Sequence, residues 1–239
     1  MKRILLISAI GVCSLANAQN VLVWSTGNSS PGDTARIASN LMASGAFTSV
    51  TGVDDNTGMT QGYLNSFDRV LYFSNTSSGQ DPTTVGDLLG GFAATGRRLV
   101  LATFSWADQG GNTLGGSIMG YSPFAVAGGS LYSNVTIGST DGSAFWNGVN
   151  SINGFFHDNV SLANGATLRG SWSDGTALLA NNGEVFGVNL FPDDIWGSVS
   201  GDFNQLFVNS LSTPVPEPAS MLALGALLIP ALRRRRARS

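Results

Sequence analysis

The sequence predicts an α/β protein with a doubly wound, mostly parallel sheet, helices on both faces and an antiparallel β addition in the C-terminal half. Continuous apolar strands that alternate with amphipathic helices in the N-terminal half predict the parallel part. Beyond Ser105 the chain changes to glycine-rich loops and short β-type segments, which predict the addition. A chain of 239 residues with 43% apolar and 11% charged residues is able to bury such a core, so disorder is a poor interpretation.

The first strand, loop and helix are expected between residues 21 and 45. Residues 21–24 form an apolar run that ends in the small polar residues Ser25 and Thr26. Asp33 is expected to cap the helix that follows. The apolar face of this helix is predicted from residues that recur with helical spacing, namely Ala38, Leu41, Met42 and Gly45.

Three further strands and one helix complete the predicted parallel part. Residues 47–53 and 69–73 are strand candidates, and the second of them again ends in small polar residues. Asp81 precedes a proline at the first helical position, a pattern that begins a helix. The helix is expected to end at Gly96, and a fourth strand follows at once over residues 99–104.

In the C-terminal half, two dipeptides predict tight turns and therefore a hairpin or meander, namely Asn164-Gly165 and Asp174-Gly175. Short β-type segments surround them at residues 131–137, 154–162, 166–172 and 176–180. Residues 184–191 return to a buried strand, and Asp202 is expected to cap a final helix. Residues 19–212 are therefore interpreted as one domain.

The N-terminal segment, residues 1–18, has the pattern of a secretory signal peptide. Two basic residues precede an apolar run, and Ala16 and Ala18 are the small residues that signal peptidase accepts. We expect cleavage after Ala18, so that the exported protein begins at Gln19. The single cysteine lies inside this segment, so the exported protein has no thiol for a disulfide, a metal site or a nucleophile.

The C-terminal segment, residues 213–239, contains a Pro-Glu-Pro triplet, a short apolar stretch and a basic end, in that order. The triplet is Pro216, Glu217 and Pro218, and the basic end includes Arg233, Arg234, Arg235 and Arg236. The apolar stretch between them would span only ~21 Å as a helix, which is less than the ~30 Å hydrocarbon core of a bilayer. An ordinary stop-transfer anchor is the alternative interpretation.

This tail resembles the PEP-CTERM sorting signal of Gram-negative bacteria. The resemblance implies that an exosortase-type membrane protease cleaves the chain near the triplet, after transient anchoring in the inner membrane. It also implies delivery to the outer envelope surface or the extracellular matrix, and a link with exopolysaccharide. The positive-inside bias would keep the arginines in the cytoplasm and leave the body outside.

The body of the chain is acidic. Residues 20–212 hold five arginines and fourteen acidic residues, a net charge of −9. A body with this charge repels nucleic acid and anionic lipid, so nucleic acid is excluded as a partner. The expected partners are signal peptidase and the exosortase-type protease, with exopolysaccharide or other matrix proteins as candidates.

The body resembles the class I glutamine amidotransferase-like superfamily, especially its ThuA-like and non-catalytic members, which have a flavodoxin-like core. The resemblance is carried by residues 21–25, 67–73, 96–103, 172–175 and 185–191. Where active amidotransferases place a cysteine after the fourth strand, this chain has Phe104-Ser105-Trp106, and it also lacks their His-x-Glu pair. The resemblance therefore implies no glutamine hydrolysis.

Polar side chains and one indole follow the predicted parallel strands, where ligands bind in doubly wound sheets. We expect a ligand-binding surface there, because amides, hydroxyls and an aromatic face suit a sugar. The candidates are Ser25, Asn28, Asn75, Ser105, Trp106 and Asp108. The alternative is structural, because Ser, Asn and Asp at strand ends often cap helices and stabilise turns.

Ser105 is also a candidate nucleophile, because its position after the fourth strand matches a nucleophile elbow. His157 is the only histidine, and Asp193 or Asp194 is the possible third member. The segment Phe104-Ser105-Trp106 lacks the flanking glycines of a Gly-x-Ser-x-Gly turn, which argues against the strained turn that an elbow needs. We therefore expect a non-catalytic protein, with a secreted serine-type hydrolase as the alternative.

Two acidic pairs, Asp54-Asp55 and Asp193-Asp194, are candidates for oxygen ligands of Ca²⁺. Neither pair has the spacing of an EF-hand, so turn formation is the better explanation. No P-loop or dinucleotide-binding glycine motif is present. The sequence therefore predicts neither a metal nor a cofactor.

Overall fold

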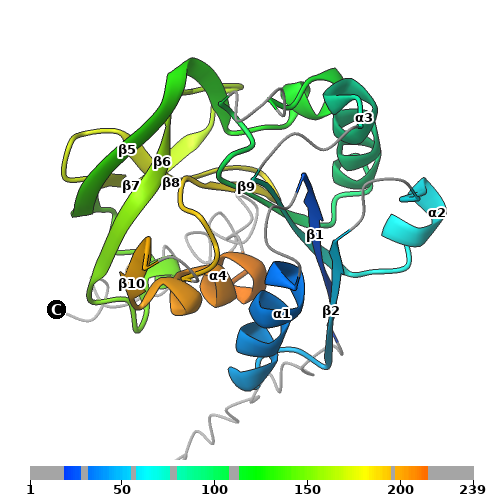
Figure 1. The fold of residues 1–239 in the computed structure, drawn as a ribbon, viewed down its shortest axis with the longest axis horizontal. Coiled ribbons are helices and arrows are strands. Elements are labelled where there is room, and N and C mark those ends of the chain that lie inside the picture. Colours follow the sequence, from blue (N-terminus) through cyan, green and yellow to red (C-terminus); the bar gives the residue numbers. More distant parts are fainter. Residues whose placement is uncertain are drawn as a thin grey trace, which may run out of the picture.

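The computed structural model describes residues 19–27, 32–54, 58–75, 80–107, 113–194 and 197–214. Within these ranges the chain forms one mixed sheet of ten strands, in the order β10-β6-β5-β7-β8-β9-β4-β3-β1-β2 (Figure 1). The predicted signal segment and the sorting motif lie outside the described residues. No helix in the described ranges is long and apolar enough to cross a membrane.

Five neighbouring strands are parallel: β2 (Ser49–Asp54), β1 (Asn20–Thr26), β3 (Arg69–Ser74), β4 (Arg98–Ala102) and β9 (Val185–Val188). Each predicted strand in this part is confirmed, with slightly different ends. Val21 is in register with Arg69, and Arg69 with Arg98, so the amino ends of these strands lie side by side at one edge of the sheet. Their carboxyl ends lie at the opposite edge.

Helices cover both faces of the parallel strands (Figure 1). One face carries α1 (Asp33–Ala43) and α4 (Phe203–Ser212), and the other carries α3 (Pro82–Ala93) and the short α2 (Gln61–Leu64). Because side chains alternate along a strand, β1 supplies Val21 and Val23 to one core and Leu22 and Trp24 to the other. The predicted cap of α3 is confirmed, since the Asp81 carboxylate accepts hydrogen bonds from two backbone N–H groups of the first turn.

The other five strands are antiparallel: β8 (Ala177–Asn182), β7 (Thr167–Trp172), β5 (Phe124–Thr140), β6 (Ile152–Leu162) and β10 (Val199–Gly201). Two 3₁₀ turns flank β5, namely η1 (Gly116–Gly120) and η2 (Ala144–Trp146). Five of the nine strand pairings in the described chain are antiparallel. The mixed α/β class is therefore confirmed, but the sheet is not mostly parallel as predicted.

The long strand β5 explains this difference. It spans 17 residues, whereas the sequence predicts a strand only over residues 131–137. Register shifts bend it, so that its first part pairs with β6 and its last part with β7. Gly138 sits where β5 crosses to β7, and a Cβ there would collide with the carbonyl oxygen of Trp172. Glycine and serine residues in the strand break the apolar alternation that would have revealed it.

Two predicted helix caps have other roles. Gly32, with a φ of 90°, precedes α1, whereas Asp33 is the first helical residue and pairs with Arg36. Asp202 precedes α4, but its Oδ2 accepts hydrogen bonds from the backbone N–H groups of residues 150 and 151, at 2.8 and 3.1 Å. The Asp33 partner lies within the first turn of α1, whereas the Asp202 partners lie about fifty residues away, where the sequence pattern does not reveal them.

The two predicted tight turns have different outcomes. Asp174-Gly175 joins β7 and β8, which pair as an antiparallel hairpin. Asn164 and Gly165 have φ values of 53° and 69° and do form a tight turn. However, this turn joins β6 to β7, and β5 lies between those two strands in the sheet. The hairpin prediction is wrong at this turn, because β5 pairs with both strands.

Candidate functional site

The predicted binding residues at the carboxyl edge lie inside the protein where the structure describes them. Ser25 ends β1, Asn75 follows β3, and Ser105 and Trp106 follow β4, and each is at most 5% exposed. The other two members of the set, Asn28 and Asp108, lie outside the described residues. The binding role of this set stays a prediction.

Trp106 packs as a core residue. Its ring meets the Phe124 ring edge-on, with ring centroids 5.0 Å apart. Its indole N–H donates to the Ser122 hydroxyl over 3.0 Å, and its backbone N–H donates to the Asp158 carboxylate over 3.2 Å. Trp106 therefore joins the end of β4 to the antiparallel part of the sheet, and its ring faces are not offered to a sugar.

Ser105 and His157 do not form a nucleophile–base pair. The Ser105 hydroxyl is buried and donates to the Ala102 carbonyl oxygen over 2.6 Å. His157, which is fully buried on β6, bonds through Nε2 to Asp174 at 2.9 Å. A serine nucleophile needs a base within hydrogen-bond reach, and no hydrogen bond joins these two side chains in the described structure.

Asp193, the possible third member, belongs to a separate cluster with Asp33 and Arg36. Arg36 Nη2 and Nε lie 2.8 and 3.2 Å from Asp193 Oδ2, and the same guanidinium pairs with Asp33. Burial and the nearby Asp193 carboxylate raise the pKa of Asp33 to about 6. Both carboxylates are at most 1% exposed, so the cluster holds the start of α1 against the loop after β9.

Asn189 is the centre of a buried polar network that the sequence did not reveal. Its Oδ1 accepts hydrogen bonds from the Thr103 hydroxyl and the Asp158 backbone N–H, at 3.1 and 2.7 Å. Its Nδ2 donates to the carbonyl oxygens of Asp158 and Ala177, at 2.8 and 2.9 Å. One side chain after β9 therefore ties together β6, β8 and the end of β4. The available signal was an asparagine within the apolar segment 184–191.

Asp158 is the acidic member of this network. Its Oδ2 accepts the hydrogen bond from Trp106, while its Oδ1 has no hydrogen-bond partner among the described residues. Burial raises the pKa of Asp158 to about 7. The carboxyl group is therefore mostly protonated at mildly acidic pH, and it becomes a buried charge as the pH rises.

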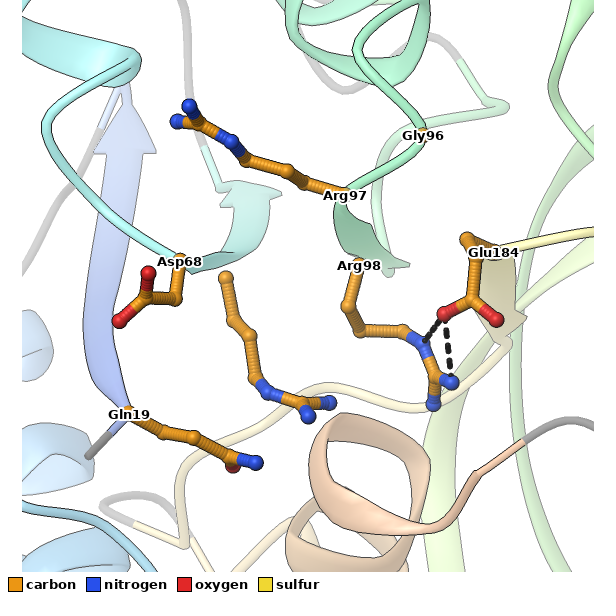
Figure 2. A pocket seen from close by; sticks show the side chains of 7 residues that line it. Gln19, Asp68, Gly96, Arg97, Arg98 and Glu184 are labelled. Carbon is orange, nitrogen blue, oxygen red and sulfur yellow. Dashed lines mark hydrogen bonds and ion pairs between the residues drawn. The ribbon is translucent and has the colours of Figure 1, made fainter. Parts of the chain in front are cut away.

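A cavity of about 610 Å³ opens at the amino edge of the parallel strands, opposite the predicted site (Figure 2). Its volume is within the usual range for ligand pockets. The lining residues are Gln19, Asp68, Arg69, Gly96, Arg97, Arg98 and Glu184. The sequence predicts no site here. The adjacent arginines at positions 97 and 98 could have indicated one, because residues 20–212 contain only five arginines.

The structure gives no candidate metal centre in the residues that it describes. Within these ranges no group of three or more His, Asp or Glu side chains is placed to hold an ion. Of the two acidic pairs considered above, Asp193 is engaged by Arg36, and Asp55 lies outside the described residues.

Comparison with known proteins finds similarity in structure but not in sequence. No family model and no curated protein matches the sequence. A cytoplasmic protein from Salmonella typhimurium aligns with a TM-score of 0.62 and 11% identity, over 81% of this chain and 97% of that chain. A ThuA-like protein from Bacteroides uniformis aligns with a TM-score of 0.58 and 12% identity, over 81% and 91%. A ThuA-like protein from Parabacteroides merdae aligns with a TM-score of 0.50 and 10% identity, over 84% and 94%.

These alignments cover more than four fifths of this chain and more than nine tenths of the other chain in each pair. The expected ThuA-like fold is confirmed. At such low identities the likeness concerns the fold alone, because one fold can carry many unrelated sites.

Proposed function

We propose that the protein is an exported, non-catalytic component of the bacterial envelope or extracellular matrix, which binds exopolysaccharide or a matrix partner. The order β2-β1-β3-β4-β9, with helices on both faces, fits a flavodoxin-like, doubly wound core related to the glutamine amidotransferases. The observation that carries the non-catalytic part is the burial of Ser105, whose hydroxyl is bonded to Ala102 and not to a base.

The proposed route of export depends on the two ends of the chain. The basic residues, apolar run and small residues before Gln19 have the order that signal peptidase requires. The Pro-Glu-Pro triplet, the apolar stretch and the arginine cluster have the order of a sorting signal. An exosortase-type protease would then release the domain to the cell surface.

The main alternative is a secreted serine-type hydrolase that uses Ser105. To act, the Ser105 side chain would have to leave the Ala102 carbonyl oxygen and meet a base at the surface. His157 would also have to leave Asp174 and its buried position on β6. Each side chain would lose a hydrogen bond, worth about 1 kcal/mol, and only the Ser105 bond is fully buried.

Catalysis is tested with ester, amide, glutamine and glycoside substrates on wild type, Ser105→Ala and His157→Ala. We expect no turnover by any of them. Ser105→Ala should cost only about 1 kcal/mol, because the Ala102 carbonyl oxygen keeps the bond from the Ser105 backbone N–H at 3.0 Å. Ser66→Ala is the matched control, since Ser66 also donates to a carbonyl three residues earlier. Wild-type turnover that Ser105→Ala abolishes, with Ser66→Ala active, would overturn the proposal.

Export is tested by intact-mass measurement on envelope and medium fractions of cells that express the full chain. We expect a form that begins at Gln19 and ends near Pro216 to Pro218, and retention on isolated exopolysaccharide without its degradation. A surface-exposed form that still carries the arginine cluster would refute sorting. Degradation of the polysaccharide would refute the non-catalytic assignment.

A further inference from the structure

Three of the five arginines of the body line one cavity. Arg69, Arg97 and Arg98 come from the amino ends of β3 and β4, which are in register, and they line the cavity of about 610 Å³ at the amino edge. Two acidic residues, Asp68 and Glu184, share the lining, so its formal charge is +1 in a body of net charge −9. The cavity is therefore a local positive site on an acidic protein.

Two of these arginines have structural partners. Arg98 is 4% exposed, and its Nε and Nη2 lie 2.7 and 2.6 Å from Glu184 Oε2. Its Nη1 donates to the backbone carbonyls of Ser210, in the last turn of α4, and Thr213, just after it. Arg97 donates to the carbonyls of Asn65 and Phe67. Figure 2 shows the Arg97 side chain directed away from Arg98, which extends toward Glu184. These two side chains hold the cavity wall in place.

Arg69 differs from both. Its Nη1 is buried and has no hydrogen-bond partner among the described residues. Burial and the neighbouring charge of Arg98 lower the pKa of Arg69 to about 10, so the group stays charged at neutral pH. Asp68 is adjacent in sequence, but its Oδ2 accepts from the backbone N–H of Asn20 at 2.9 Å. A buried guanidinium nitrogen without an acceptor is costly unless a ligand supplies one.

A second unsatisfied group lines the same cavity. Gln19 Oε1 is buried and has no hydrogen-bond partner among the described residues. The Gln19 amide offers both donors and an acceptor, so it suits a hydroxyl group. Arg69 and Gln19 together therefore match a small molecule that carries an acidic group and hydroxyls.

We infer that this cavity binds a small oxyanion, with Arg69 as its main ligand, Gln19 as a second hydrogen-bonding group, and Arg97 and Arg98 as the surrounding positive charge. A guanidinium binds carboxylate, phosphate and sulfate by the same paired N–H geometry. A hydroxylated carboxylate, such as a sugar acid, would satisfy both unpartnered groups. This inference does not depend on the absence of catalysis. The proposed cleavage after Ala18 would make Gln19 the first residue and add an α-amino group beside the cavity, which increases its positive charge.

The test is calorimetric titration of the purified protein with D-glucuronate, inorganic phosphate and inorganic sulfate, with D-glucose as the neutral control. We expect saturable binding of D-glucuronate and none of D-glucose. Arg69→Gln should weaken binding at least about tenfold, and Arg69→Lys should weaken it less, because lysine keeps the charge but loses the fork of donors. Arg169→Gln is the matched control, since it removes one positive charge from a different site, where Arg169 pairs with Asp141.

A second measurement uses only the wild-type protein, so its outcome does not depend on whether a variant folds. The Nε–H signals of the five body arginines can be followed by NMR in the wild-type protein as each anion is added. The inference holds if the Arg69 signal shifts and the Arg169 signal does not. The anion that binds most tightly then shows whether the cavity prefers a carboxylate, a phosphate or a sulfate. It is overturned if none of the three anions binds saturably, or if Arg69→Gln and Arg169→Gln weaken binding equally.

Discussion

Replacing Asp158 by asparagine should remove most of the loss of stability that the protein shows as the pH rises. In the folded state burial raises the pKa of Asp158 from its ordinary value of 3.8 to about 7. Between these values the unfolded chain has released the proton and the folded protein still holds it. The unfolded state then binds fewer protons, so the free energy of unfolding falls as the pH rises through this window.

The magnitude follows from the two pKa values. The full shift, from 3.8 to about 7, corresponds to roughly 4 kcal/mol between the protonated and ionised forms. Between about pH 5 and about pH 8 the Asp158 contribution is roughly 2 to 3 kcal/mol. Asparagine has nearly the same shape, and its carbonyl oxygen can still accept the bond from the Trp106 backbone N–H. Asp158→Asn should therefore be more stable than wild type above neutral pH.

The assay is urea unfolding of wild type and Asp158→Asn at several pH values, with the difference in the free energy of unfolding plotted against pH. Asp33, whose pKa is raised to about 6, has an effect of the same sign but is present in both proteins, so it cancels in the difference. Parallel curves for the two proteins would refute the reasoning, because they would show that Asp158 does not change its charge in this range.

Three further predictions concern the packing. Asn189→Ala should lower the free energy of unfolding by at least about 3 kcal/mol in urea titrations, because four buried hydrogen bonds disappear, and a loss below about 1 kcal/mol would contradict the network. Gly86→Ala should lower the melting temperature clearly, because the new Cβ would collide with the carbonyl oxygen of Gly115. Gly62→Ala is the control, because a Cβ there has open space, and its melting temperature should stay within a few degrees of the wild-type value. Arg98→Met should lower the free energy of unfolding by about 3 kcal/mol, because it removes the donor to two backbone carbonyls at the end of α4, and an unchanged urea midpoint would argue against that role.

Features that depend on neighbouring residues could be predicted from the sequence. Strands with both faces buried need continuous apolar runs, so residues 21–24 and 69–73 were recognisable. The Asp81 cap and the Asp174-Gly175 turn were also correct, because each is a short-range pattern with its own backbone geometry. The expected processing of both chain ends depends only on the local order of charged, apolar and small residues, and it stays a prediction.

The pairing of distant polar groups, in contrast, depends on the tertiary fold. Arg98 and Glu184 are 86 positions apart, as are Thr103 and Asn189, so no local spacing reveals either pair. The full length of β5 and its two partners depend on register shifts and on a close backbone crossing. The fold also buries Ser105 at the edge where the sequence predicts a site. At the opposite edge it buries Arg69 Nη1, which has no hydrogen-bond partner among the described residues. Burial and pairing of polar groups arise from contacts between distant segments, and these contacts exist only once the sheet has formed.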